Sequence, residues 1–122
     1  MKYSRKNKES VYQPSDDSFL LLDAVCDNLA KNTFTKKLQI LEACCGTGVI
    51  IRAVYDLLGA DHHYIALDKH SLAAETTTDT FKLDPGCENY TVLVSDNLDE
   101  IENNSIDIII CNPVSIFNLI YL

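Results

Sequence analysis

Four apolar runs of this sequence end near a carboxylate or an Asn-Pro pair, residue types that bind or position polar ligands. Glu42 lies near the end of LQILEA and Asp68 closes HYIALD. Asp96 closes YTVLVSD, and Asn112-Pro113 follows IDIIIC. In open parallel α/β sheets, ligands bind outside the carboxyl ends of the strands. A single such carboxylate is more often a surface charge or a helix cap, so the prediction of a site depends on their joint placement.

The turn CCGTG, residues 44–48, indicates which kind of ligand this edge would take. Gly46 and Gly48 allow the backbone to approach a ligand closely. Asp68 is well placed to accept hydrogen bonds from both hydroxyls of a ribose, and Asp96 could accept one from an adenine amino group. Glu42 would repel a pyrophosphate, and the dinucleotide pattern G-x-G-x-x-G is not matched. The residues therefore favour a cationic nucleoside cofactor over NAD.

Strands and helices alternate along the chain. Pro14, Ser15 and the acidic pair Asp16-Asp17 predict a helix start. Its apolar face comprises Phe19, Leu22, Val25, Cys26 and Leu29. Further helices are predicted over 49–59 and 70–83, the second weakened by its threonines, with a short helical turn over 97–101. This alternation predicts an α/β fold with a mainly parallel sheet, helices on both faces and the strand order third, second, first, fourth.

The composition limits the class of protein further. The chain has 122 residues, enough for one domain, and a formal net charge of −8, which disfavours a nucleic-acid partner. Its basic start, residues 1–10, is predicted to be a flexible leader. There is no signal-peptide pattern or apolar run of membrane-spanning length, and the five cysteines lack paired spacing. We therefore expect a cytoplasmic or nuclear protein with free cysteines, no metal site and no membrane contact.

Several segments together resemble a known family. LQILEACCGTGV resembles the first motif of class I methyltransferases, IALD and VSDNL resemble the second and third motifs, and CNP resembles the start of the Asn-Pro-Pro-Tyr motif. VYQPSDDSFLLLDAV is similar to the Tyr-x-Pro-x-x-Asp-Thr/Ser-x-x-Leu-Leu segment of the HemK-like protein glutamine methyltransferases. The closest resemblance is to the eukaryotic branch, which acts on the Gly-Gly-Gln loop of the class I translation release factor. The resemblance covers roughly residues 10–113.

The resemblance implies a Rossmann-like class I methyltransferase fold and a cofactor, S-adenosylmethionine, converted to S-adenosylhomocysteine. The binding domain would span 11–113, with Tyr12 and Pro14 covering the pocket. The implied lining residues are Ser18, Glu42, Cys44, Gly46, Gly48, Asp68, Asp96 and Asn97. Asn112 and Pro113 would be catalytic, because the Asn side chain and the Pro carbonyl accept hydrogen bonds from the substrate amide and orient its nitrogen. The implied partners are a class I release factor and a small zinc-binding activator subunit.

Two departures from the family pattern shape the expected function. Cys44 replaces a motif glycine, which predicts a narrower approach to the cofactor, and Val114-Ser115 replace Pro-Tyr. From the second departure we expect a truncated, weakly active or inactive form that lacks the C-terminal strands. The atypical apolar tail, 114–122, is interpreted as a translated intron. The alternatives are a nucleic-acid adenine-N6 methyltransferase and a non-catalytic cofactor-binding fragment.

Overall fold

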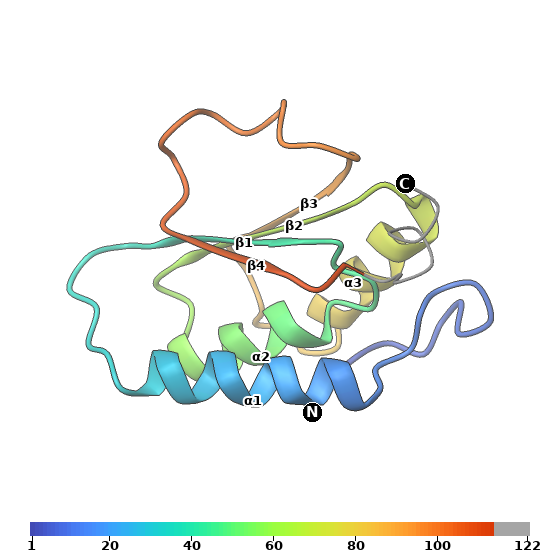
Figure 1. Ribbon diagram of the computed structural model, residues 1–122, viewed down its shortest axis with the longest axis horizontal. Helices are drawn as coiled ribbons and strands as arrows, with labels where there is room; N and C mark the ends of the chain where they lie inside the picture. The colour runs from blue at the N-terminus through green and yellow to red at the C-terminus, as the bar shows by residue number, and fades with distance from the viewer. Residues whose placement is uncertain (114–122) are drawn as a thin grey trace.

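The computed structural model describes residues 1–113, so the apolar tail predicted for 114–122 lies outside the described residues. Within these residues the sheet contains four parallel strands in the order β3-β2-β1-β4, which confirms the predicted order (Figure 1). The elements along the chain are α1 Asp16–Ala30, β1 Gln39–Ala43, α2 Val49–Leu58, β2 His63–Asp68, α3 Ser71–Phe81, β3 Tyr90–Val94 and β4 Ile108–Cys111.

The register of the strands aligns their carboxyl ends. Ala43 of β1 lies opposite both Leu67 of β2 and Cys111 of β4, and Asp68 lies opposite Val94 of β3. The residues that follow these strands therefore leave the sheet at one edge. This alignment follows from short strands joined by right-handed crossovers, which return the chain to the same starting edge each time.

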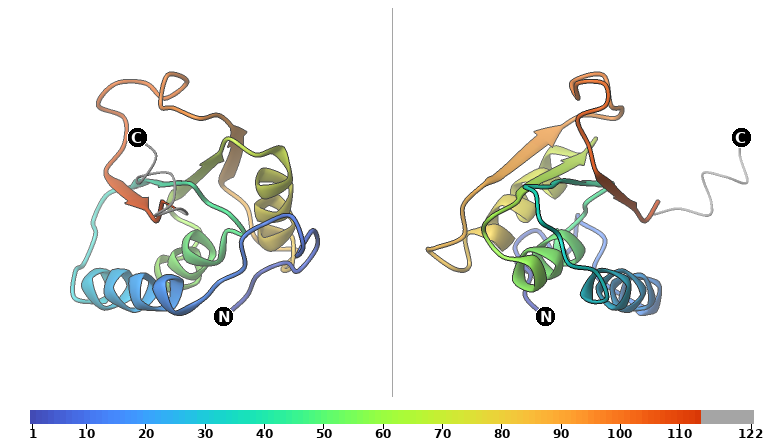
Figure 2. Two further views of the ribbon diagram at one scale, coloured as in Figure 1. Left: turned by 45° about the vertical axis from the view of Figure 1, so that its right-hand side comes forward. Right: turned by 90° about the vertical axis from the view of Figure 1, so that its left-hand side faces the viewer.

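All three helices among the described residues lie on one face of the sheet (Figures 1 and 2). The fold class and the parallel sheet agree with the sequence analysis. Helices were predicted on both faces of the sheet, but in the described residues the opposite face is covered by a connection without a helix. The β1–β2 and β2–β3 crossovers run in the same direction and place α2 and α3 on one side. The returning connection, residues 95–107, crosses the other face as turns. Its apolar contacts are Ile101 and Ile106, which pack on a small cluster of Leu41, Ile65 and Leu67.

The predicted helical turn over 97–101 does not form a helix, and side-chain hydrogen bonds explain this. The Asn97 side-chain oxygen accepts the Asp99 N–H at 2.9 Å, and the Ser95 hydroxyl donates to the Asn97 carbonyl at 2.9 Å. Such local bonds offer the backbone an alternative to helical pairing.

The N-terminal residues, predicted to be a flexible leader, pack along α3 in the structure. The Ser4 N–H donates to the Thr80 hydroxyl at 2.8 Å, and the Lys6 ammonium lies 2.7 Å from the Glu75 carboxylate. The difference arises because α3 presents acidic and hydroxyl side chains that the basic segment can bind.

Helix α2 is tied to the end of α3 by a buried arginine. Arg52 is 1% exposed. Its guanidinium donates to the Thr80 carbonyl at 2.9 Å and forms ion pairs with Asp56 and Asp84. An arginine can be buried here because every side of its planar group meets an acceptor. Within residues 1–113, no helix combines the length and apolar character needed to cross a bilayer.

Candidate cofactor-binding site

The turn between β1 and α2 is built from residues in the left-handed backbone region. Cys44 has φ 55°, Gly46 φ 55° and Gly48 φ 77°. Gly48 caps the start of α2 and donates its N–H to the Cys45 carbonyl at 2.8 Å. The left-handed region costs a residue with a side chain about 1–2 kcal/mol. Cys44 therefore occupies a conformation that favours glycine, which gives a physical reason for the glycine expected there.

Two threonines of α3 hold this turn from below. Thr77 donates its hydroxyl to the Gly46 carbonyl at 2.9 Å, and Thr80 donates to the Thr47 carbonyl at 2.6 Å. Both threonine side chains are fully buried. A Cβ added to Gly48 would lie 2.8 Å from the Thr77 methyl carbon, so a residue with a side chain would be crowded between the turn and α3 at this position. Thr77 and Thr80 have low helix propensity, yet in α3 they position the turn.

The carboxylate of Asp68 ties the same turn to the end of β2. One oxygen accepts the Gly46 N–H at 3.1 Å, and the other accepts the His70 N–H at 3.0 Å. Each carboxylate oxygen can accept a further hydrogen bond. Asp68 can therefore support the turn and still bind hydroxyl groups of a ligand.

Glu42 is the buried acid of the site. Its side chain is 2% exposed, and one oxygen accepts the Ile51 N–H from the first turn of α2 at 3.2 Å. Within residues 1–113 no basic side chain forms an ion pair with it. Burial raises the pKa of this carboxyl well above its ordinary value, and the charge of Asp68 raises it further, against the hydrogen bond from Ile51. A cationic ligand would supply the missing counter-charge.

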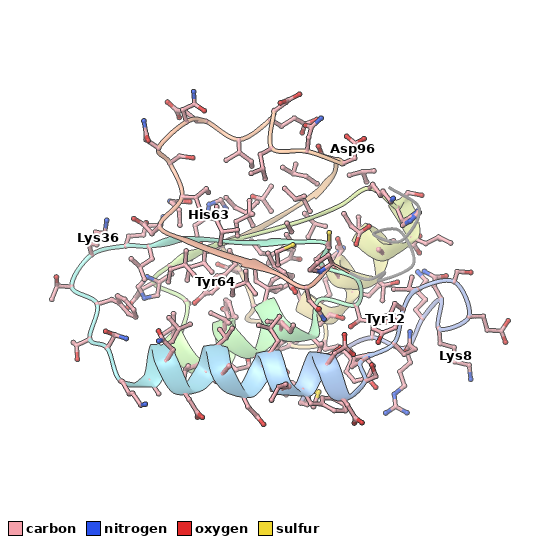
Figure 3. The ribbon with its side chains drawn as sticks, in the orientation of Figure 1. Lys8, Tyr12, Lys36, His63, Tyr64 and Asp96 are labelled. Carbon is pink, nitrogen blue, oxygen red and sulfur yellow. The ribbon has the colours of Figure 1, made fainter. Side chains whose placement is uncertain are left out.

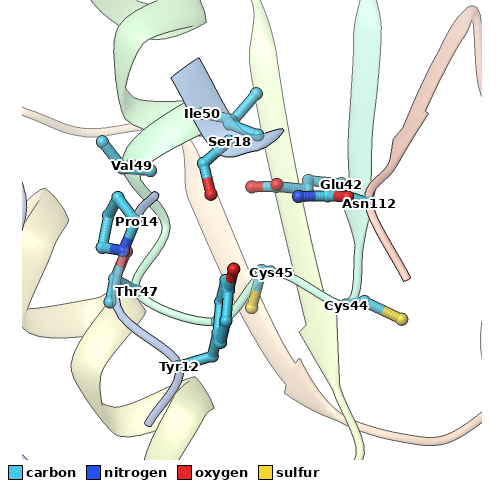
Figure 4. A pocket seen from close by; sticks show the side chains of 11 residues that line it. Tyr12, Pro14, Ser18, Glu42, Cys44, Cys45, Thr47, Val49, Ile50 and Asn112 are labelled. Carbon is cyan, nitrogen blue, oxygen red and sulfur yellow. The ribbon is translucent and has the colours of Figure 1, made fainter. Parts of the chain in front are cut away.

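A pocket of about 330 Å³, including space open to solvent, lies over this turn (Figure 4). Seven of the predicted site residues line it, namely Tyr12, Pro14, Ser18, Glu42, Cys44, Gly46 and Asn112. Four further lining residues were missed, namely Cys45, Thr47, Val49 and Ile50. Their signal in the sequence was their position within the turn 44–48 or directly after it, since such residues must border any ligand that the turn holds.

The remaining predicted residues lie apart from the pocket lining. Gly48 caps the start of α2, and Asp68 accepts the Gly46 N–H. Asp96 and Asn97 are exposed on the connection after β3, and Pro113 is exposed after β4. Figure 3 places Asp96 on the loop side of the sheet and Tyr12 on the helix side.

Asn112 reaches the pocket from the end of β4, where a residue missed by sequence analysis contacts it. The Asn112 side-chain amide donates to the Asp17 carboxylate at 3.2 Å. The Tyr12 hydroxyl donates to the other oxygen of Asp17 at 2.9 Å. Asp17 stood in the sequence as half of an acidic pair at a helix start and as the Asp of the Tyr-x-Pro-x-x-Asp segment, but neither pattern predicted this contact.

The fold and the glycine turn define the class of protein. The structure is similar to a ribosomal protein L11 methylase from Lactobacillus delbrueckii subsp. bulgaricus (TM-score 0.59, 15% identity, 75% of this chain and 44% of that one). It is also similar to a SAM-dependent methyltransferase from Aquifex aeolicus (TM-score 0.58, 17% identity, 80% and 57%). A human methyltransferase 10 domain containing protein gives a TM-score of 0.57 at 13% identity, over 89% and 56%. The fold is that of the Rossmann-like class I methyltransferases.

Sequence comparison then gives the family. Residues 16–114 match the methyltransferase small domain, and the chain belongs to this family. Ribosomal RNA large subunit methyltransferase G of Pseudomonas putida (strain W619) is 29% identical over 75 residues, 62% of this chain. Its counterpart from Pseudomonas syringae pv. tomato is 28% identical over the same length. The chain spans about a fifth of the length of these curated relatives.

The cofactor of this fold and family is S-adenosylmethionine, and the described residues fit it. The buried Glu42 carboxylate has no cationic partner among them, which suits a ligand that carries an ammonium group. Gly46 opens the turn, since a Cβ added there would meet no atom closer than 3.9 Å. The groups that face the pocket thus suit a cationic nucleoside, whereas the Glu42 carboxylate would repel a pyrophosphate.

Proposed function

We propose that this chain is the cofactor-binding part of an S-adenosylmethionine-dependent N-methyltransferase. The observation that supports the proposal best is that Asn112 lies in one pocket with the buried Glu42 and the glycine turn. When bound, S-adenosylmethionine supplies a methyl group on a positively charged sulfur. The residues of the chain have to bind that cation, exclude water and orient an acceptor nitrogen.

Each residue of the pocket has a proposed role in holding the cofactor. Glu42 would pair with the ammonium group, and Asp68 would accept hydrogen bonds from the ribose hydroxyls. Tyr12 and Pro14 would cover the pocket, and Asp96 with Asn97 would contact the adenine end. A charge-assisted hydrogen bond of this kind contributes about 1.5–3 kcal/mol.

For the acceptor, we propose the side-chain amide of a glutamine in a class I release factor. The support is that the Tyr12-to-Ser18 segment, similar to that of the HemK-like enzymes, lines the same pocket as Asn112. The Asn112 side-chain oxygen and the Pro113 carbonyl would accept the two N–H groups of an amide. Such orientation can lower a barrier by roughly 7–11 kcal/mol. A small zinc-binding subunit is the activator that the family resemblance suggests.

Ribosomal RNA is the second candidate acceptor. The observation that favours it is that both curated relatives are ribosomal RNA methyltransferases. The charge of the chain opposes it, since 18 acidic residues outnumber 10 lysines and arginines, and phosphate binding relies on basic side chains.

Calorimetry with S-adenosylhomocysteine tests the cofactor site. We expect the parent chain to bind it, and Asp68→Ala to weaken binding by about 1.5–3 kcal/mol. Asp61→Ala is the matched control, because Asp61 is an exposed acid just before β2. Unchanged affinity in Asp68→Ala, or preferential binding of NAD by the parent chain, would refute the assigned site.

Transfer of a labelled methyl group separates the acceptors. Release factor and ribosomal RNA are offered to the 122-residue chain and to a longer version from the same gene. We expect transfer to the release factor by the longer version and weak transfer by the 122-residue chain, because Val114-Ser115 replace half of the orienting motif. Transfer to ribosomal RNA alone would overturn the glutamine assignment in favour of the second candidate.

A further inference from the structure

The two ends of the Asn112 amide are chemically opposite, and only one orientation is useful for the proposed function. The oxygen accepts hydrogen bonds and the NH2 group donates them. An acceptor nitrogen that presents N–H groups needs the oxygen. Rotating the amide by half a turn exchanges the two ends at little cost unless a neighbour discriminates between them.

Asp17 is such a neighbour. Its Oδ2 accepts the Asn112 Nδ2–H at 3.2 Å, across 95 positions of sequence. Its Oδ1 accepts from the Ser15 hydroxyl at 2.5 Å and from the Tyr12 hydroxyl at 2.9 Å.

The charge of Asp17 is maintained by these donors. Hydrogen bonds from Ser15, Asn112 and Tyr12, in that order of size, lower the pKa of Asp17 to about 2. The group is therefore an ionised carboxylate at neutral pH and can only accept. A rotated Asn112 would place its oxygen against this negative charge and lose the hydrogen bond.

We propose that Asp17 is a positioning residue: by accepting Nδ2–H, it fixes the amide of Asn112 so that the Oδ1 atom faces the acceptor. This inference rests on the proposed role of Asn112. Asp17 also binds the hydroxyl of Tyr12, which lines the cofactor pocket. One carboxylate at the start of α1 thus joins the cover of the cofactor to the residue that orients the acceptor.

Nuclear magnetic resonance of the 122-residue chain tests the orientation without any need for activity. The side-chain NH2 signals of Asn112 are assigned by their loss in Asn112→Asp. We expect Asp17→Asn to shift both signals and to speed their exchange with water. Asp16→Asn is the matched control, since it removes a neighbouring exposed charge from the same helix turn and should leave the signals in place. Unchanged signals in Asp17→Asn would overturn the proposal.

Methyl transfer by the longer version from the same gene supplies the functional readout, with the wild type and the three variants Asp17→Asn, Asp16→Asn and Asp17→Glu compared on the same acceptor. We expect Asp17→Asn to lower kcat by about 10- to 100-fold, with a smaller effect on the cofactor Kd through its contact with Tyr12. Asp17→Glu should recover part of the rate, because it restores a carboxylate. Equal losses of kcat in Asp17→Asn and Asp16→Asn would show that Asp17 acts only as a negative charge at the start of α1, and would overturn the proposal. Failure of the wild-type chain to bind S-adenosylhomocysteine would refute the proposed function instead, and the NH2 signals would still decide the orientation.

Discussion

The two halves of the sheet edge are built in different ways. At the ends of β1 and β2, Glu42 and Asp68 are buried, and the intervening turn is held by hydroxyls of α3. At the ends of β3 and β4, Asp96 is exposed and Asn112 is half-buried, held by a side-chain contact to α1. The first half is preformed by the fold, whereas the second depends on surface contacts. Changes in the first half should therefore alter stability, and changes in the second should alter function alone.

The largest effect is expected from Gly48→Ala. The new side chain would be forced into a left-handed conformation, φ 77°, with its Cβ 2.8 Å from Thr77. Strain and overpacking together should cost about 2–4 kcal/mol in the free energy of unfolding, measured with urea. Gly86→Ala is the control, because a Cβ there meets no atom within 4 Å. If Gly48→Ala lost less unfolding free energy than Gly86→Ala, the turn would not be preformed by the fold.

Glu42→Gln should stabilise the chain at neutral pH while weakening cofactor binding. Because burial raises the pKa of Glu42, its contribution to stability is complete below the unfolded pKa of about 4.3 and is lost as the pH rises through the folded pKa. The variant avoids this loss, so its advantage should grow with pH, to about 1–3 kcal/mol. Urea unfolding at pH 4 and pH 8 measures it. A variant less stable than the wild type at pH 8 would show that Glu42 is not an uncompensated acid.

Cys44→Gly should stabilise the turn by about 1 kcal/mol, since glycine adopts the left-handed region without strain. Thermal and urea unfolding measure the gain, and calorimetry should show tighter binding of S-adenosylhomocysteine. Cys44→Ala serves as the control, because it removes the thiol but keeps the Cβ and therefore the strain. If both variants behave alike, the thiol and not the backbone limits the site.

The smallest effect is expected from Asp96→Ala, which tests the half of the sheet edge at the ends of β3 and β4. Asp96 is exposed, so the free energy of unfolding should change by less than about 0.5 kcal/mol. Affinity for S-adenosylhomocysteine should fall about threefold to tenfold, the contribution of one ordinary hydrogen bond. Asp99→Ala, an exposed acid on the same connection, is the control for charge. If Asp96→Ala lost stability without any change in its affinity for S-adenosylhomocysteine, this end of the sheet edge would serve stability and not binding, contrary to the comparison.

Sequence reasoning predicted the parts of the fold that local chemistry dictates. The order of the strands followed from their alternation with helices, and the glycine turn followed from Gly46 and Gly48. Glu42 and Asn112 were expected at one edge of the sheet and line one pocket in the structure, because carboxyl ends of parallel strands meet at one edge.

What sequence reasoning missed depends on contacts between distant segments. Thr80 contacts both the turn and Ser4, 76 positions away, and its role was invisible in a helix judged by propensity alone. Asp17 contacts Asn112 across 95 positions. The missing helix over 97–101 was decided by the Asn97 and Ser95 side chains, which compete with the backbone for hydrogen bonds.

The pairing of β4 with β1 has a consequence for the order in which the protein folds. Gln39 contacts His63, 24 positions away, but it contacts Asp107 across 68 positions. Closing the longer loop costs more chain entropy, and contacts between distant segments slow folding. We expect pulsed hydrogen exchange to show protection of β1 and β2 amides before those of β4. Asn112, which follows β4, would then be the last residue of the pocket to take its place, so a nascent chain would acquire its nucleoside site before it could orient an acceptor.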